Sequence, residues 1–122
     1  HMVLRGSSHG INYDAAGIAE AGRKLAHLSD PTRLVIDCSH GNSAKDPLNQ
    51  PDVLKTIIAE RLKTKVRGVM LESHLVDGNQ KISEQMTYGQ SITDGCLGWA
   101  KTEQMLLNMT DSLRLEGLRR SA

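Results

Sequence analysis

Short apolar runs alternate along this chain with longer segments in which apolar residues recur at helical spacing. The clearest predicted strands, at 34–38 and 66–72, are mainly apolar, and shorter strand-like runs occupy 2–5 and 90–93. Near-continuous apolar strands separated by helices are typical of parallel sheets with right-handed crossovers. The pattern therefore predicts an α/β fold with a parallel sheet and the element order β-α-β-α-β-β-α.

Three helices are expected in this order. The first begins after an N-cap at Asp14 and stops at 29–31, the second begins near Pro51, and the third spans about 97–118. Their apolar positions are Ile18, Ala21, Leu25 and Leu28, then Val53, Leu54, Ile57, Ile58 and Leu62, then Leu106, Met109 and Leu113. Within the polar segment 75–89, the turn signal Asp77-Gly78-Asn79 suggests a small hairpin.

Composition narrows the class of protein. The 122 residues suffice for one domain, and 15 Lys plus Arg against 14 Asp plus Glu argue against nucleic acid as a partner. With no Phe and one Trp the core must be aliphatic. Cys38 and Cys96 are expected to be free thiols in a reducing compartment. No membrane span or signal peptide is visible, so we expect a cytoplasmic chain without membrane partners. Residues 1–2 are expected to be the remnant of a cleaved tag.

Polar side chains follow three of the predicted strands. His40 comes after the strand at 34–38, Glu72 ends the second run and Asp94 ends the third. Because parallel strands align their carboxyl ends at one edge, these side chains are expected to converge. Imidazole and carboxylate ligands together suit Mn²⁺, Fe²⁺, Co²⁺ or Zn²⁺. Taken singly, each has an ordinary explanation: a hydrogen-bonded structural histidine, or a carboxylate that caps a helix.

Other polar residues fall near the same predicted edge. Arg5 could clamp a carboxylate or phosphate, or could form a surface ion pair. Asn42, Ser43 and Lys45 form a polar loop that could line a pocket. The alternative for Lys45 is a solvated side chain. Asp37 is placed to orient His40 or a neighbouring basic group.

Several blocks of the sequence, in order, resemble one known family. These are Leu4-Arg5-Gly6, Asn12-Tyr13, Ile36-Asp37-Cys38-Ser39-His40-Gly41-Asn42-Ser43, Gly68-Val69-Met70-Leu71-Glu72-Ser73-His74-Leu75, Asp77-Gly78-Asn79-Gln80, Tyr88-Gly89-Gln90-Ser91-Ile92-Thr93-Asp94 and Gly98-Trp99. Together they resemble the carboxyl-terminal half of type I 3-deoxy-D-arabino-heptulosonate 7-phosphate (DAHP) synthase, and the resemblance covers residues 3–122.

The resemblance implies a (β/α)8 barrel transferase that condenses phosphoenolpyruvate with erythrose 4-phosphate at the start of the shikimate pathway, which leads to the aromatic amino acids. Family members use a divalent metal held by Cys, His, Glu and Asp. The His, Glu and Asp match His40, Glu72 and Asp94. The arginine that contacts phosphoenolpyruvate matches Arg5, and His40 would lie beside that substrate as well.

The departures from the family imply an incomplete enzyme. The Gly-Pro-Cys-Ser block with the cysteine ligand and the Lys-Pro-Arg-Thr block for erythrose 4-phosphate are absent, and neither Cys38 nor Cys96 stands in a matching context. Ser7 and Ile11 replace a usual glycine and proline. A full barrel needs about 250 residues, so about the last four strands are expected here. Exposed sheet edges then favour self-association as a homo-oligomer.

Three functions compete on these grounds. The first is a DAHP synthase fragment that is inactive without its amino-terminal half. The second is a non-catalytic binding or assembly module derived from that enzyme. The third, an unrelated metal-dependent hydrolase, would need Asp37 or His74 as its general base and is the least supported.

Overall fold

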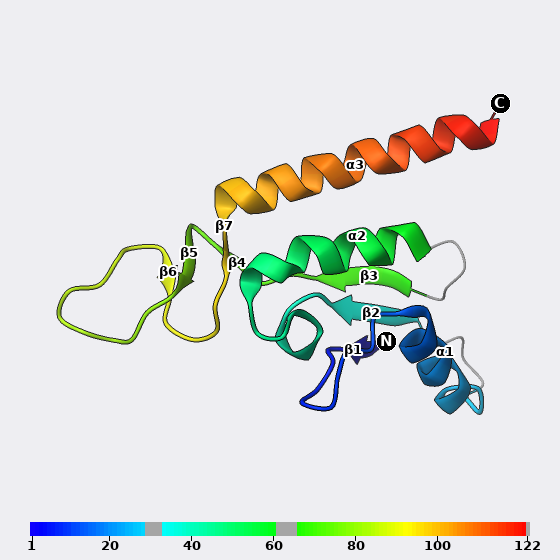
Figure 1. Cartoon of the computed structure of the whole chain (residues 1–122), viewed down its shortest axis with the longest axis horizontal. Helices are drawn as coiled ribbons and strands as arrows, with labels where there is room; N and C mark the ends of the chain where they lie inside the picture. Colours follow the sequence, from blue (N-terminus) through cyan, green and yellow to red (C-terminus); the bar gives the residue numbers. More distant parts are fainter. Residues whose placement is uncertain (29–32, 61–65, 122) are drawn as a thin grey trace. The chain divides into compact units, whose positions relative to one another are not determined.

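The computed structural model describes residues 1–28, 33–60 and 66–121. The chain divides into two compact units, His1–Glu72 and Ser73–Ala122, and each is described by itself (Figure 1). In the described part of the chain, no helix combines the length and apolar character needed to cross a membrane.

The first unit contains a three-stranded parallel sheet in the order β1-β2-β3. Its strands are β1 (Met2–Leu4), β2 (Leu34–Asp37) and β3 (Val66–Met70). Met2 pairs with Leu34 at one end, and Asp37 pairs with Met70 at the other. The predicted parallel α/β arrangement is confirmed, and the three carboxyl ends lie at one edge of the sheet.

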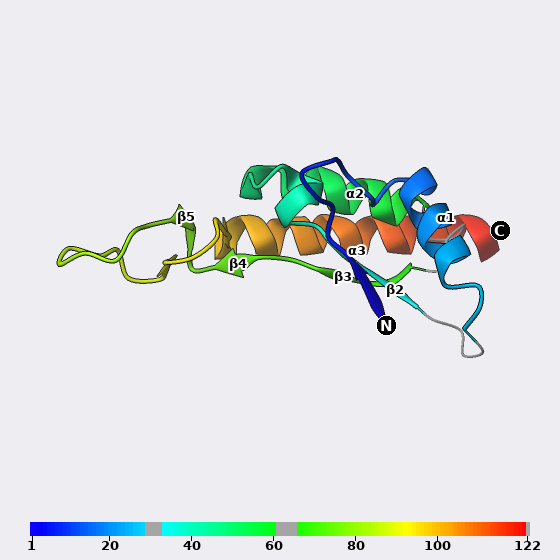
Figure 2. The ribbon, with the colours of Figure 1, turned by 90° about the horizontal axis from the view of Figure 1, so that it is seen from below.

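Helices α1 (Ala15–Lys24) and α2 (Gln50–Glu60) lie on the same face of this sheet, as Figure 2 shows. The strand side chains that they cover alternate with exposed ones such as Val3, in keeping with the period of two along a strand. Aliphatic side chains form the core beneath the helices: Leu4, Ile18, Ala21, Leu34, Ile36, Val53, Leu54 and Ile57.

The predicted starts of both helices are confirmed, but α1 is shorter than expected. Asp14 caps α1, since its Oδ1 accepts the Gly17 N–H at 2.9 Å. The helix ends at Lys24 because the chain tightens there, with hydrogen bonds from Ala26 N to Arg23 O and from Leu28 N to Leu25 O. Leu28 is consequently 45% exposed rather than part of the core. The expected stop at 29–31 and the expected apolar position Leu62 lie outside the described residues.

Two short 3-10 helices, which the sequence pattern did not predict, connect β2 to α2. They are η1 (His40–Ser43) and η2 (Pro47–Asn49). Asp46 caps the second, its Oδ1 accepting the Leu48 N–H at 2.9 Å. This connection places His40 directly beyond the carboxyl end of β2 and carries the chain to the start of α2.

The second unit contains four short strands and one long helix. The strands are β4 (Ser73–His74), β5 (Val76–Asn79), β6 (Gln90–Ser91) and β7 (Leu97–Gly98), and the helix is α3 (Trp99–Ser121). β4 pairs with β7 and β5 with β6, both parallel. Thr102 and Met105 are the buried side chains of α3 among those described for that helix.

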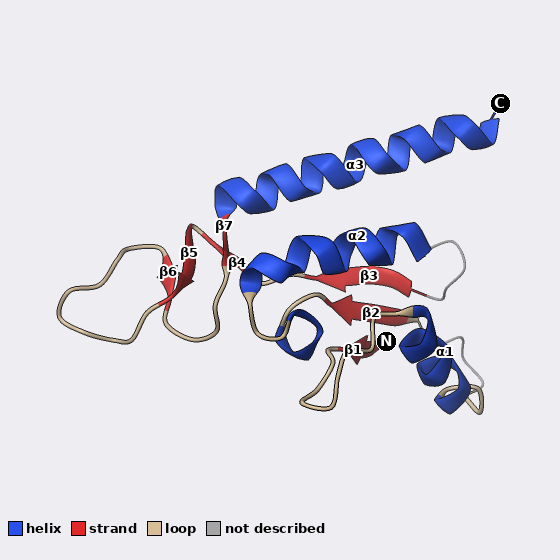
Figure 3. Ribbon diagram, in the orientation of Figure 1, coloured by secondary structure: helices blue, strands red, loops and turns tan. Residues whose placement is uncertain are grey.

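The predicted hairpin at Asp77-Gly78-Asn79 is wrong. These residues lie within β5, which pairs in parallel with β6 rather than folding back on itself. Gly78 has a φ of +80°, which most residues avoid, and the β5–β6 register shifts between Val76 and Asn79. The Asp-Gly signal therefore marks an irregular strand. A long loop over 80–89 joins β5 to β6 (Figure 3).

Asp77 anchors the start of α3 through its carboxylate. Its Oδ1 accepts the Gly98 N–H at 2.7 Å, and its Oδ2 lies 2.7 Å from Lys101 Nζ. The hydrogen bond with Lys101, followed by that with the Gly98 amide, lowers the pKa of Asp77. The charged carboxylate is thus favoured in the folded state.

We expect Asp77→Asn to lower the free energy of unfolding at pH 7, because the amide keeps an acceptor for Gly98 but loses the ion pair. A carboxyl group with a lowered native pKa stabilises above its unfolded value, near 3.8, and loses that contribution as the pH falls through the native pKa. The difference in the free energy of unfolding between wild type and Asp77→Asn should therefore vanish as the pH falls through the native pKa of Asp77. Urea titrations followed by Trp99 fluorescence measure it. Lys101→Met should reduce this pH dependence without abolishing it, because the Gly98 N–H still donates to Asp77. A pH-independent difference between wild type and Asp77→Asn would contradict this account.

Candidate metal centre

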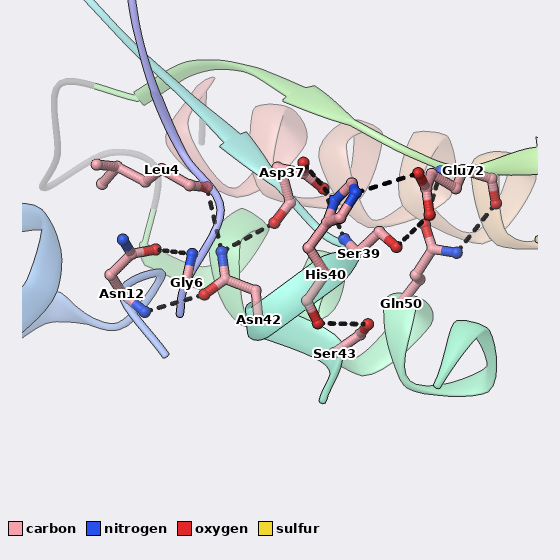
Figure 4. A network of polar contacts seen from close by, with 10 residues as sticks. All are labelled: Leu4, Gly6, Asn12, Asp37, Ser39, His40, Asn42, Ser43, Gln50 and Glu72. Atoms are coloured by element: carbon pink, nitrogen blue, oxygen red, sulfur yellow. Dashed lines mark hydrogen bonds and ion pairs between the residues drawn. The ribbon is translucent and has the colours of Figure 1, made fainter. Parts of the chain in front are cut away.

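A polar cluster lies at the carboxyl edge of the first unit's sheet (Figure 4). β2 ends in Asp37 and leads to Ser39 and His40, while Glu72 follows β3. The His40 Nε2 atom lies 3.4 Å from Glu72 Oε1. The predicted convergence of these two residues, which are far apart in sequence, is thus observed.

Asp37 fixes the orientation of the His40 ring. Its Oδ2 lies 2.8 Å from His40 Nδ1, and its Oδ1 accepts the Ser39 N–H at 2.8 Å. Because a carboxylate only accepts, Nδ1 carries the proton in this contact. Asp37 is 3% exposed, so the interaction is sheltered from water. The ring therefore presents Nε2 toward Glu72, as in the carboxylate–histidine arrangements that support metal ligands.

The Glu72 carboxylate is held in a similar way. Ser39 Oγ donates to Oε2 at 2.6 Å, which leaves Oε1 as the oxygen that faces His40. Both side chains are partly exposed, with 21% of His40 and 25% of Glu72 accessible. The pair is therefore ordered by its neighbours and still reachable from solvent.

The donor set fits a divalent cation. With Nδ1 protonated, a neutral His40 presents the lone pair of Nε2 to a carboxylate oxygen, and two acceptors that face each other at 3.4 Å do not attract. Either a proton on Nε2 or a cation bound by both atoms makes the arrangement favourable. A nitrogen and an oxygen ligand together suit Mn²⁺, Fe²⁺, Co²⁺ or Zn²⁺.

The backbone of η1 is strained at the histidine itself. His40 has a φ of +50°, in the left-handed region that non-glycine residues rarely adopt. The Lys45 N–H donates to His40 O at 2.8 Å, which helps to hold this conformation. Strain of this kind persists where the surrounding contacts fix it, and it is common at functional sites.

Asn42 joins the ends of β1 and β2. Its Nδ2 donates to Leu4 O at 3.1 Å and to Asp37 O at 2.8 Å, and its Oδ1 accepts the Asn12 N–H at 2.9 Å. The side chain is 3% exposed. Its polar groups therefore stabilise the strand ends that carry Asp37, and its predicted part in substrate binding stays a prediction.

The remaining candidates are placed less specifically. Arg5 and Lys45 are exposed residues of the first unit, Arg5 directly after β1. Asp94 is an exposed residue of the second unit, beyond β6. Burial raises the pKa of Cys38 to about 12, so this thiol stays protonated and is no ready metal ligand.

Two residues that contact Glu72 were not predicted from the sequence. They are Ser39 and Gln50. Ser39 lies between Asp37 and His40, just beyond the end of a predicted strand, and this position is the sequence signal that marks it. Gln50 is fully buried at the start of α2, where a glutamine ordinarily faces solvent. No pattern in the sequence marks it.

Parallel strands joined by helices, with a histidine and carboxylates at the carboxyl edge, define an α/β protein with an enzyme-like site. The model of the DAHP synthetase I family matches residues 1–107, and the chain belongs to this family.

Individual relatives agree with this assignment. The tyrosine-inhibited phospho-2-dehydro-3-deoxyheptonate aldolase of Schizosaccharomyces pombe is 41% identical over 122 residues, covering 93% of this chain and 32% of the relative. The Trp-sensitive enzyme of Enterobacter agglomerans is 42% identical over 118 residues, covering 93% of this chain and 33% of the relative. A solved structure of the aldolase from Francisella tularensis matches with a TM-score of 0.85 and 38% identity, over 93% of this chain and 34% of that one. The chain thus spans about a third of the length of these relatives.

Proposed function

We propose that this chain is the metal-bearing, carboxyl-terminal part of a DAHP synthase, the enzyme that condenses phosphoenolpyruvate with erythrose 4-phosphate. The observation that carries the proposal is the series Asp37–His40–Glu72. In it, the Asp37 carboxylate orients the His40 imidazole toward the Glu72 carboxylate. The relatives named phospho-2-dehydro-3-deoxyheptonate aldolase, another name of DAHP synthase, support the proposal.

In this proposal His40 and Glu72 hold a divalent metal, and Asp94 is proposed as a further ligand because it matches the aspartate of the family's metal-binding motif. The metal would act as a Lewis acid toward the aldehyde of erythrose 4-phosphate. Arg5 binds phosphoenolpyruvate through its guanidinium, which is suited to two parallel hydrogen bonds with a carboxylate or phosphate. His40 lies beside the same substrate, while Asn42 orders the loop that carries it.

Lys45 follows the same loop and is the proposed contact for substrate phosphate or carboxylate groups. Its φ of +62° and the N–H that it donates to His40 O tie its backbone to that of the histidine. A cation near the rim of the site would attract the anionic substrates electrostatically.

We further propose that the parallel strands form part of a (β/α)8 barrel. Val3 and Met70 support this proposal: each is 45% exposed, and both lie on the sheet face opposite the buried Leu4 and Ile36. Apolar strand residues of this kind line barrel interiors. The isolated chain would cover them by self-association as a homo-oligomer.

The test of the proposed function is an assay for phosphate release from phosphoenolpyruvate and erythrose 4-phosphate in the presence of Mn²⁺. The chain alone should show no turnover, and addition of the amino-terminal two thirds of a relative should restore it. Light scattering in the same samples should give a mass above the 13.4 kDa of one chain when the chain is alone. Robust turnover by the chain alone would contradict the fragment assignment.

The second candidate function is a non-catalytic binding or assembly module derived from the enzyme. The observation that favours it is that the chain covers only about a third of the length of its relatives. Metal binding separates the two. A retained single site supports the fragment of an enzyme, and its absence supports the module.

A further inference from the structure

Gln50 makes an unusual pair of contacts with the backbone of Glu72. Its Nε2 donates to Glu72 O at 3.0 Å, and its Oε1 accepts the Glu72 N–H at 2.9 Å. One carboxamide thus satisfies both main-chain polar groups of one residue, as a neighbouring strand would do. Glu72 lies beyond the end of β3 at Met70, where the ladder with β2 has stopped.

The two hydrogen bonds are buried, and they satisfy both polar ends of the Gln50 carboxamide. Gln50 is 0% exposed, and each end of its carboxamide has a partner in the Glu72 backbone. Burying a carboxamide is unfavourable unless it is hydrogen-bonded, so the two bonds are what makes this residue tolerable in the core. Helix α2 already packs through Val53, Leu54 and Ile57, so an apolar residue at position 50 would serve its packing as well.

We propose that Gln50 is a positioning residue for the carboxylate of Glu72, an inference that rests on the proposed metal centre. Gln50 fixes the main chain at Glu72, and Ser39 fixes carboxylate oxygen Oε2. With both ends of the residue held, Oε1 is directed at His40 Nε2. The start of α2 therefore sets the separation between the two proposed ligands.

This role predicts a specific effect on metal affinity. Gln50→Met fills the same volume but leaves the Glu72 N–H and C=O without these partners. Loss of a supporting contact around a metal ligand ordinarily weakens binding about 10- to 100-fold. We expect a loss of this size in Mn²⁺ affinity for the folded variant, together with faster hydrogen exchange at the Glu72 amide.

The experiment titrates Mn²⁺ into the full chain and follows the signal of free Mn²⁺ by electron paramagnetic resonance. Ile57→Val is the matched control, because it weakens the packing of the same helix and leaves both hydrogen bonds between Gln50 and Glu72 in place. It should bind Mn²⁺ as wild type does. If Gln50→Met folds poorly, Gln50→Glu keeps an acceptor for the Glu72 N–H but loses the donor to Glu72 O. It should lower the Mn²⁺ affinity and leave the Glu72 amide exchange nearly unchanged.

The outcomes separate this inference from the proposed function. Wild-type binding with an equal affinity in Gln50→Met, or an unchanged Glu72 amide exchange in that variant, would overturn the role of Gln50 and leave the metal centre standing. Failure of the wild-type chain to bind Mn²⁺ would overturn the metal centre itself, and the role of Gln50 with it.

Discussion

Glu72→Ala should abolish the single-site binding of Mn²⁺ or Zn²⁺ that we expect of the wild-type chain. The substitution removes the oxygen that lies 3.4 Å from His40 Nε2, together with the acceptor of the Ser39 hydroxyl. Removing a supporting residue alone costs about 10- to 100-fold in affinity, so loss of a ligand should exceed about 100-fold. Isothermal titration calorimetry of wild type and variant measures the difference.

Glu103→Ala is the control for this experiment. Glu103 is an exposed carboxylate on α3, and its removal should leave the isotherm unchanged. If Glu72→Ala bound the metal as tightly as wild type, the metal would lie elsewhere on the chain. If neither the wild-type chain nor Glu72→Ala bound the metal, the non-catalytic module would become the better description of this chain.

Gly6→Ala should destabilise the first unit by about 2–5 kcal/mol. Gly6 has a φ of +66°, which costs a residue with a side chain about 1–2 kcal/mol. A Cβ there would also lie 2.6 Å from Asn42 N and 2.6 Å from the carbonyl carbon of Gly41. Backbone atoms cannot move aside as a flexible side chain can, and such overpacking adds about 1–3 kcal/mol. Urea unfolding followed by circular dichroism measures the loss.

Gly22→Ala provides the matched comparison. Gly22 lies inside α1, and a Cβ at this position would meet nothing within 4 Å. Alanine at such a helical site should stabilise by about 0.5–1 kcal/mol. Equal effects of the two substitutions would contradict the close approach between the loop after β1 and the loop after β2.

The sequence was sufficient to predict the parallel sheet and the convergence of His40 and Glu72. Four apolar residues among the five at 34–38 indicate a strand buried on both faces, which is the property of a parallel sheet. Polar residues after such strands must emerge at one edge, so the meeting of His40 and Glu72 followed from strand direction alone. The N-cap at Asp14 was predictable for a similarly local reason, its contact with the nearby Gly17.

What the sequence did not predict depends on contacts between distant segments. Gln50 and Glu72 meet only because the start of α2 packs beside the end of β3. Helical periodicity does not predict which strand end a helix packs against. The Asp-Gly pair at 77–78 is the local signal of a hairpin, yet β5 pairs with β6 because the chain has a distant strand available. Asn42 donates to Leu4 O and Asp37 O, two contacts with the ends of distant strands that no sequence pattern predicted.

The central claim is that His40 binds a divalent metal through Nε2, and it can be measured directly. Electron–nuclear double resonance of the Mn²⁺-loaded chain with ¹⁵N-labelled histidine should show one coupled imidazole nitrogen. The coupling should disappear in His40→Gln and persist in His27→Gln, whose exposed ring lies beyond the end of α1. A coupling that survives in His40→Gln, or bound Mn²⁺ with no coupled nitrogen, would contradict the metal centre described above.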